Sequence, residues 1–187
     1  MHKYLKERSM MLLRSLATAA CCALLTTASF AQTGDSKPPL SPPATADVTL
    51  KGKQVTINYN SPRLKDRIIG TTIVPYGKVW RTGANPATTL IAATNLKIGT
   101  LDVPAGTYTI YTLPNADQWL LIINKQTGQW GTEYSESKDL GRTPMQSKTL
   151  PSSQENMSIG FEHTKGGSTE LHVKWGTTDE YVGVHAE

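Results

Sequence analysis

The sequence predicts an all-β fold, an antiparallel β-sandwich or jelly roll formed by a single domain that follows a signal peptide. Three observations predict it. Short segments alternate apolar and polar residues with a period of two, as half-buried strands do. Gly, Pro and Asn separate these segments at intervals of about a dozen residues, which is typical of sandwiches and jelly rolls. No stretch of similar length repeats its apolar positions with the helical period of about 3.6 residues, so helical folds are excluded.

The expected strands begin near residue 48. Val55, Ile57 and Tyr59 alternate with polar residues, and the turn at residues 51–53 pairs this strand with residues 48–50. Residues 119–123 are apolar on both faces, which indicates a central strand. A turn at Gly166-Gly167 joins two further alternating segments. The remaining strands are expected at residues 88–94, 107–113, 157–161, 171–175 and 181–184.

Residues 1–31 have the pattern of a cleavable export signal. A positive segment is followed by residues 16–29, which are apolar, rich in Ala and too short to span a bilayer comfortably. Small residues stand at the first and last positions of Ser29-Phe30-Ala31, so we expect cleavage after Ala31. The protein is then periplasmic or extracellular, without stable insertion in the membrane.

Two alternatives to this interpretation are an uncleaved anchor helix and a lipoprotein attached at Cys21 or Cys22. A lipidated cysteine needs an aliphatic residue three positions upstream, and Thr18 and Ala19 occupy those positions. Lipidation at this point would also leave very little apolar sequence after the last basic residue, Arg14. The cleavable signal fits the pattern best.

Cleavage removes both cysteines and most of the positive charge. The chain has 187 residues, two cysteines and a formal net charge of +4. A net charge of +3 lies in residues 1–31, so the mature protein carries +1; the charged residues of the signal are Lys3, Lys6, Glu7, Arg8 and Arg14. A nearly neutral protein has no electrostatic basis for binding nucleic acid or an anionic membrane. A mature chain without thiols has no disulfide, no cysteine-ligated metal and no cysteine nucleophile.

Proline separates the signal from the domain. Residues 32–46 contain Lys37-Pro38-Pro39 and Ser41-Pro42-Pro43. Because proline fixes φ and removes backbone donors, we expect an extended linker over these residues. The β-sandwich domain is then expected to cover residues 47–187, which is enough chain for one core.

The densest group of unusual residues lies between two expected strands, a position where functional groups often sit on a rigid sheet. It reads VPYGKVWRTGANP at residues 74–86. This segment resembles the hallmark PYGKVWRTGAN of a bacterial exported family known only as a domain of unknown function, DUF2911. The resemblance continues through LDVPAGTY at residues 101–108, Trp119 with residues 122–124, and Trp130-Gly131, and it covers residues 55–175.

The resemblance implies a secreted or periplasmic β domain and brings no established activity, cofactor or catalytic residue. The chain departs from the family pattern at one position. Members usually carry an acidic residue directly after the asparagine of the hallmark, and this chain has Pro86 there. A hydrolase mechanism that relies on an acid at that position is therefore disfavoured.

Five side chains of this segment form the candidate ligand-binding site. Arg81 offers a planar fork of donors for carboxylate, phosphate or sugar hydroxyls, and Asn85 offers both a donor and an acceptor. Trp80 and Tyr76 offer aromatic faces for stacking, and Lys78 a point charge. The alternative left open is bracing, in which Arg81 and Asn85 satisfy backbone carbonyls and Trp80 closes the end of the sheet.

Signatures of metal, cofactor and nucleophile chemistry are missing from the sequence. No pair of histidines has the spacing of a zinc motif, so we predict no metal site and no cofactor. His172 shares a strand face with Glu170, opposite the apolar residues, and is expected to face solvent. His163 lies across the hairpin from it, and a metal there would need Glu162 or Glu170 as a further ligand. Neither a Gly-x-Ser-x-Gly elbow nor a phosphate-binding glycine loop occurs.

The leading hypothesis is therefore a binding protein rather than an enzyme. Recognition-type side chains gather at residues 76–85 without a matching nucleophile or metal set. We expect an exported domain that binds a polar small molecule or a glycan in the cell envelope. The alternatives are an interaction or structural protein of the envelope that pairs through its sheet edges, and a hydrolase-type enzyme with a site assembled from scattered residues.

Export predicts a defined new N-terminus. Expressed in full in a Gram-negative host, the protein should appear in the periplasm or the medium with Gln32 as its first residue, because the signal ends at Ala31. Intact-mass spectrometry of the periplasmic fraction measures this. As a control, Ala31→Leu should block processing by placing a bulky residue at the cleavage site. Recovery of the folded protein with residues 1–31 attached would contradict the expectation.

Overall fold

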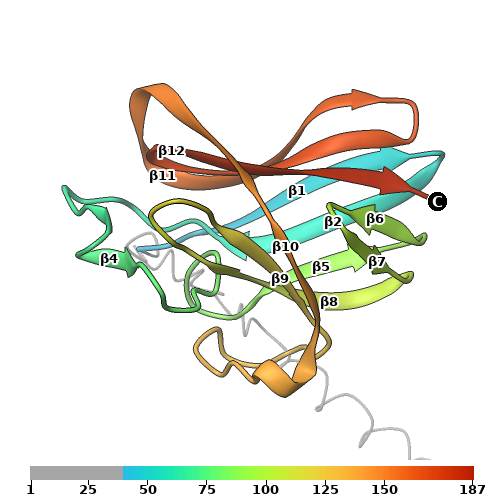
Figure 1. Ribbon diagram of the computed structural model, residues 1–187, viewed down its shortest axis with the longest axis horizontal. Helices are drawn as coiled ribbons and strands as arrows, with labels where there is room; N and C mark the ends of the chain where they lie inside the picture. Colours follow the sequence, from blue (N-terminus) through green and yellow to red (C-terminus); the bar gives the residue numbers. More distant parts are fainter. Residues whose placement is uncertain (1–39) are drawn as a thin grey trace, which may run out of the picture. The chain divides into compact units, whose positions relative to one another are not determined.

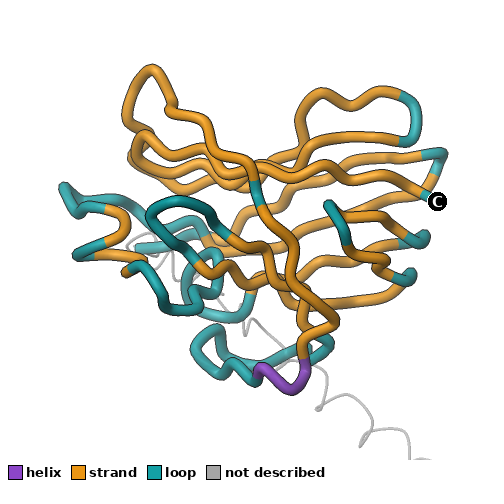
Figure 2. The backbone as a smooth tube through the Cα atoms, viewed as in Figure 1, coloured by secondary structure: helices purple, strands orange, loops and turns teal. Residues whose placement is uncertain are grey.

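Strands dominate residues 40–187, which are the residues that the computed structural model describes (Figure 1, Figure 2). All of them belong to one compact unit, so the predicted all-β fold class is confirmed. The first six strands are β1 (Pro43–Leu50), β2 (Lys53–Asn60), β3 (Ile69–Gly70), β4 (Ile73–Pro75), β5 (Thr88–Ala92) and β6 (Leu96–Ile98). The others are β7 (Leu101–Val103), β8 (Gly106–Leu113), β9 (Leu120–Asn124), β10 (Asp139–Pro144), β11 (Gln146–Lys165) and β12 (Ser168–Ala186).

The only helix in the described part of the chain is the 3₁₀ helix η1 (Glu136–Lys138). No helix among residues 40–187 has the length and apolar character needed to cross a bilayer. The predicted signal segment, residues 1–31, and the linker up to residue 39 lie outside the described residues.

The larger sheet has six antiparallel strands in the order β1-β2-β5-β8-β9-β10. A two-residue turn joins β1 to β2, with Lys51 and Gly52 at φ values of 48° and 74°, as a left-handed hairpin turn requires. The edge strand β1 begins at Pro43, whose missing N–H is tolerated at a sheet edge. The sheet therefore includes residues 43–46, which the sequence analysis assigned to the linker. Ala44 and Ala46 pack against the core there, with side chains too small to produce a visible alternation.

The smaller sheet packs on the larger one and has the order β11-β12-β6-β7, while β3 and β4 form a separate parallel pair. Alternate residues of both sheets meet in one core, among them Ile57 and Ile110 of the larger sheet and Leu171 and Val184 of the smaller. Burial of this apolar surface, worth about 25 cal/mol per Å², holds the layers together. The arrangement is the predicted sandwich (Figure 1).

The outer face of the larger sheet is partly covered as well. Tyr111 of β8 and Ile122 of β9 are fully buried but do not belong to the core between the sheets. The segment between β9 and β10 supplies part of their cover, because the Gln129 amide donates to the Tyr111 hydroxyl at 3.1 Å and the Tyr134 ring meets the Tyr111 ring edge-on at 4.9 Å. Strand β9 is thus buried on both faces, as its sequence predicts.

Strand β12 is bent at Gly176, whose φ of 57° lies in the left-handed region. Residues 171, 173 and 175 face the core before the bend, and residues 182, 184 and 186 face it afterwards. The inward residues change from odd to even numbers because the bend adds one residue to the alternation. As a result Glu180 is buried on the inner side, while Asp179 lies on the outer side within 2.7 Å of His172.

Three tryptophans join the two sheets at the end of the sandwich where β12 bends, which is the left end in Figure 1. The Trp80 ring stacks on Trp175 with centroids 5.7 Å apart and meets Trp119 edge-on at 6.3 Å. Trp80 also exchanges two backbone hydrogen bonds with Thr112 of β8, at 2.8 and 2.9 Å. The tryptophan cluster (Trp80, Trp119 and Trp175) therefore links β8 and the start of β9 to β12.

Replacing the buried member of this cluster should cost much of the stability of the domain. Trp175 is 2% exposed, so Trp175→Ala should lower the free energy of unfolding by about 3–5 kcal/mol, the usual cost of emptying a large aromatic site. Urea unfolding followed by circular dichroism measures it. Trp130, which is 51% exposed, provides the matched control, since Trp130→Ala should stay within about 0.5 kcal/mol of wild type. Equal losses for the two variants would contradict the role of the cluster.

Candidate functional site

The hallmark segment, residues 74–86, runs from β4 across the end of the sandwich to β5, and its first residues fix Tyr76. Val74 has a φ of 52°, a conformation that costs a β-branched residue about 1–3 kcal/mol. Its side chain is nevertheless buried in the core. The Tyr76 N–H donates to the Gly70 carbonyl at 3.2 Å, and the tyrosine ring lies so close to Gly70 that a Cβ there would overlap it. The ring is held in place while 45% of the residue stays exposed.

The remaining hallmark residues contact the fold itself. Trp80 belongs to the tryptophan cluster. Arg81 and Asn85 both contact Gly131. The stem of Arg81 lies against the glycine, and the backbone carbonyl of Asn85 accepts a hydrogen bond of 3.1 Å from the Gly131 N–H. The Nε of Arg81 is buried without a hydrogen-bond partner among the described residues. Lys78 is exposed.

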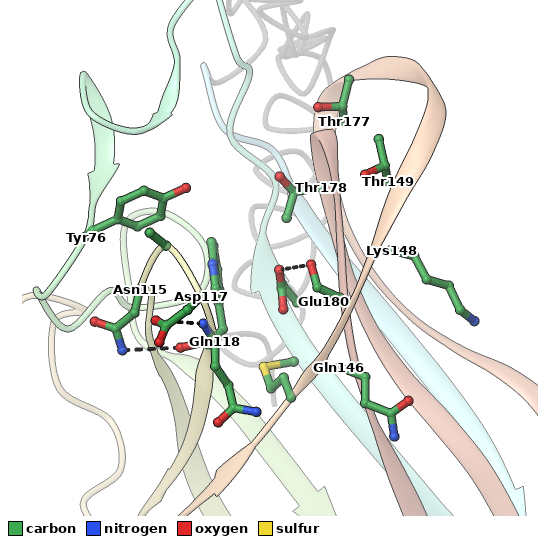
Figure 3. A pocket seen from close by; sticks show the side chains of 14 residues that line it. Tyr76, Asn115, Asp117, Gln118, Gln146, Lys148, Thr149, Thr177, Thr178 and Glu180 are labelled. Carbon is green, nitrogen blue, oxygen red and sulfur yellow. Dashed lines mark hydrogen bonds between the residues drawn. The ribbon is translucent and has the colours of Figure 1, made fainter.

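A pocket of about 430 Å³ opens beside Tyr76, between the two sheets at this end of the sandwich (Figure 3). Its size falls in the usual range of small-molecule sites, roughly 300–1,000 Å³. Tyr76 and the β8–β9 loop form one wall, and the start of β11 and the bend of β12 form the other. The lining residues are Tyr76, Asn115, Ala116, Asp117, Gln118, Trp119, Met145, Gln146, Ser147, Lys148, Thr149, Thr177, Thr178 and Glu180.

The structure thus brings together only part of the candidate site that the sequence predicts. Tyr76 lines the pocket, whereas Lys78, Trp80, Arg81 and Asn85 are not among its lining residues. Trp80 is connected to the pocket indirectly, because its edge-on partner Trp119 lines it.

The polar group with the least exposure in the pocket is Glu180, which is 2% exposed. Ser147 donates a hydrogen bond of 2.7 Å to its Oε1, while Oε2 is buried without a partner among the described residues. Burial raises the pKa of this carboxyl above its ordinary value, the Ser147 hydrogen bond opposes the rise, and the nearby Asp179 adds to it. The wall of the pocket therefore contains a carboxyl group that favours its neutral form.

Behind the same wall lies a charged network on the outer side of β12. The His172 Nδ1 is 2.7 Å from an oxygen of Asp179, its Nε2 is 3.2 Å from Glu170, and its ring stacks on Tyr181 with centroids 5.0 Å apart. His172 is 1% exposed, so the expectation that it faces solvent is wrong. The strand face was assigned correctly, but the bend at Gly176 folds residues 179–181 over it.

Lys174 pairs with the carboxylate of Glu162 in this network and lies 3.8 Å from Asp179. The hydrogen bond from Lys174 lowers the pKa of Glu162, and the charge of His172 lowers it further. Lys148 lies 4.1 Å above the Tyr181 ring, and it also lines the pocket. The His163 and His172 rings lie 6.1 Å apart, as the sequence allowed. No three His, Cys, Asp or Glu side chains converge as a metal site within residues 40–187.

Comparison with known proteins places the whole arrangement in one family. A profile described as "Protein of unknown function (DUF2911)" matches residues 41–184. The chain belongs to the DUF2911 family. No curated protein and no solved structure matches it. The DUF2911 match extends from β1 into β12, so it includes both sheets, the tryptophan cluster and every residue of the pocket.

Sequence reasoning missed most of the pocket. The sequence analysis did not single out the β8–β9 loop, Asn115 to Gln118, and only its position opposite Tyr76 makes it part of the pocket. Glu180 offered a usable signal, since a carboxylate stands beside Asp179 immediately before the apolar end of β12. The inward-facing residues change from odd to even numbers at Gly176, and this turns Glu180 inward. The sequence carries the change in Leu171, Val173 and Trp175 before the glycine and Val182 and Val184 after it.

The pKa of Glu180 predicts a pH-dependent effect on stability. A carboxyl whose pKa is raised in the folded state contributes stability below its ordinary pKa of 4.5, and that contribution is lost as the pH rises through the folded value. Glu180→Gln keeps the side chain neutral, so it should be more stable than wild type in urea unfolding at a pH of about 8, with the difference shrinking near pH 4.

Exposed Glu133 provides the control for this measurement, because Glu133→Gln should show no such pH-dependent gain. If Glu180→Gln were instead less stable than wild type at the higher pH, the charge on Glu180 would have to be favourable in the folded state.

Proposed function

We propose that this DUF2911 protein binds a polar, hydroxyl-rich small molecule, such as a sugar, in the pocket beside Tyr76. The observation that carries the proposal is an exposed tyrosine ring held rigidly at the wall of a polar pocket of about 430 Å³. Aromatic faces stack on the apolar faces of sugar rings, while hydroxyls need donors and acceptors around their rim.

The lining matches that requirement. Amide groups of Asn115, Gln118 and Gln146 are present together with the hydroxyls of Thr149 and Thr178. Amides and hydroxyls both donate and accept, so they suit a ligand whose groups do the same. The pocket residues also include Asp117, Lys148 and Glu180, whose formal charges sum to −1, and this favours a neutral ligand over an anion.

The fixed position of Tyr76 supports a role beyond packing. Strain at Val74 and the close approach at Gly70 both lie next to this ring, and strained backbone is found preferentially at functional sites. The stacking of Trp80 on Trp175 and the 3.5 Å hydrogen bond from the Asn85 amide to the Ser41 carbonyl support the bracing role that the sequence left open. Arg81 contributes the packing of its stem against Gly131. We therefore assign ligand contact to Tyr76 and support of the segment to Trp80, Arg81 and Asn85.

We also infer that the pocket acts outside the cytoplasm, in the cell envelope or beyond it. The support is the export pattern of residues 1–31, a segment that lies outside the described residues. A preformed pocket in a sandwich without cysteines suits that location, because the domain does not depend on the redox state of its surroundings.

The proposal predicts that binding depends on the ring of Tyr76. Mature protein, residues 32–187, would be screened by thermal shift and then calorimetry against monosaccharides, disaccharides, polyols and organic acids. Tyr76→Ala should weaken the binding of any sugar found in the screen by at least about tenfold. Stacking of a ligand ring on an aromatic side chain contributes about 1–3 kcal/mol in comparable sites. Tyr76→Phe should keep the affinity within a few-fold, because the stacking face remains.

Trp130→Ala is the control, since it removes another exposed aromatic residue that does not line the pocket. Binding that survives Tyr76→Ala unchanged would sink the proposal. So would a screen in which organic acids bind and no hydroxyl-rich compound does.

A further inference from the structure

A second pocket adjoins the first on the far side of Tyr76. It has a volume of about 330 Å³ and shares Tyr76, Thr177 and Thr178 with the polar pocket. In Figure 3 these three residues stand at one end of the polar pocket, which is the end where the two cavities meet. The two pockets are therefore neighbours with Tyr76 in the wall that they share.

The lining of the second pocket differs in chemistry from that of the first. Leu64, Ile68 and Ile69 contribute aliphatic side chains from the β2–β4 connection. Its one charged residue, Arg67, is already used: its Nε donates to the Leu64 carbonyl at 2.9 Å and one terminal nitrogen donates to the Arg63 carbonyl at 2.7 Å. Because the guanidinium braces its own loop, the pocket offers apolar surface and hydroxyl groups in similar measure, a larger apolar share than the polar pocket has.

The apolar surface is open to a ligand. Ile68 is 65% exposed, a high value for an isoleucine beside a cavity. Leu64 and Ile69 are half-buried, and Gly176 adds no side chain over them, since a Cβ there would stand 3.5–3.6 Å from their methyl groups. Covering exposed aliphatic surface with an apolar part of a ligand removes it from water and lowers the free energy of the complex.

We propose that the natural ligand is an amphiphile, a polar hydroxyl-rich head joined to an aliphatic chain. The head lies in the polar pocket and the chain passes Tyr76 to lie against Ile68, Leu64 and Ile69. This inference rests on the proposed function and extends it, because it assigns the second pocket to the same ligand. A purely polar oligosaccharide fits less well, since its hydroxyls would lie against the aliphatic side chains of Leu64, Ile68 and Ile69, which cannot hydrogen-bond them.

Alkyl β-glucosides from methyl to octyl test the inference, used below the concentrations at which they form micelles. The mature protein, residues 32–187, should bind them with a Kd that falls by about two- to fourfold for each methylene that enters the second pocket. Calorimetry gives the Kd of each member. The slope of log Kd against chain length measures the contact with the chain separately from the contact with the head.

Three variants separate the contributions of the two pockets. Ile68→Ser should flatten the slope, whereas Ile91→Ser, a change at another exposed isoleucine on β5 that does not line the pocket, should leave it as in wild type. Gln118→Ala, in the polar pocket, should weaken all glucosides by a similar factor and keep the slope. Both isoleucines are at the surface, so neither variant should prevent folding.

The outcomes divide cleanly between the two proposals. A Kd that is the same for methyl and octyl glucoside, or a slope that survives Ile68→Ser, would overturn the amphiphile inference and leave the polar pocket intact. Failure of every glucoside and of every polar compound in the screen would overturn both. A slope that Ile68→Ser removes and Ile91→Ser preserves would support the amphiphile.

Discussion

The stacking of Trp80 on Trp175 is the contact on which this end of the molecule depends. Trp80 lies in the connection between β4 and β5, and Trp175 lies at the bend of β12. Their ring centroids are 5.7 Å apart, and this contact joins the two sheets. The backbone of Trp80 is meanwhile paired with Thr112 near the end of β8, so the connection that carries the ring is anchored to the larger sheet. Trp119, the third member, lines the polar pocket, which means that the same packing that closes the core also forms part of the wall of the site.

The bend at Gly176 has consequences on both faces of the smaller sheet. On the inner face it directs Glu180 into the wall of the pocket, where burial favours the neutral carboxyl. On the outer face the bend folds Asp179 and Tyr181, the two neighbours of Glu180, over His172. Asp179 hydrogen-bonds the histidine and Tyr181 stacks on its ring. Residues 177–180 therefore contact the pocket on one side and the network on the other. The buried His172 does not line the pocket, but its hydrogen-bond partner Asp179 directly precedes the pocket residue Glu180.

The fold was largely predictable because its strands carry regular alternation. Val55, Ile57 and Tyr59 pair and face as their pattern indicates, and the two-sided apolar pattern of β9 corresponds to burial on both faces. The first strand was placed too late because Ala44 and Ala46 give almost no apolar signal. The site was harder, since its walls come from four separated segments. Tyr76 was singled out because unusual residues surround it in the sequence, and it lines the pocket. Gln118 and Thr178 line the pocket only because the β8–β9 loop and the bent strand face each other.

The conformation of Val74 bears on how a ligand would associate with the protein. Its side chain is buried although its backbone is strained, so the strain cannot be released by local movement without exposing apolar surface. The tyrosine two residues later is consequently in place before any encounter. A preorganised surface loses little conformational entropy on binding, and association with it needs no preceding rearrangement. Differences in affinity between ligands would then come mainly from differences in their dissociation rates.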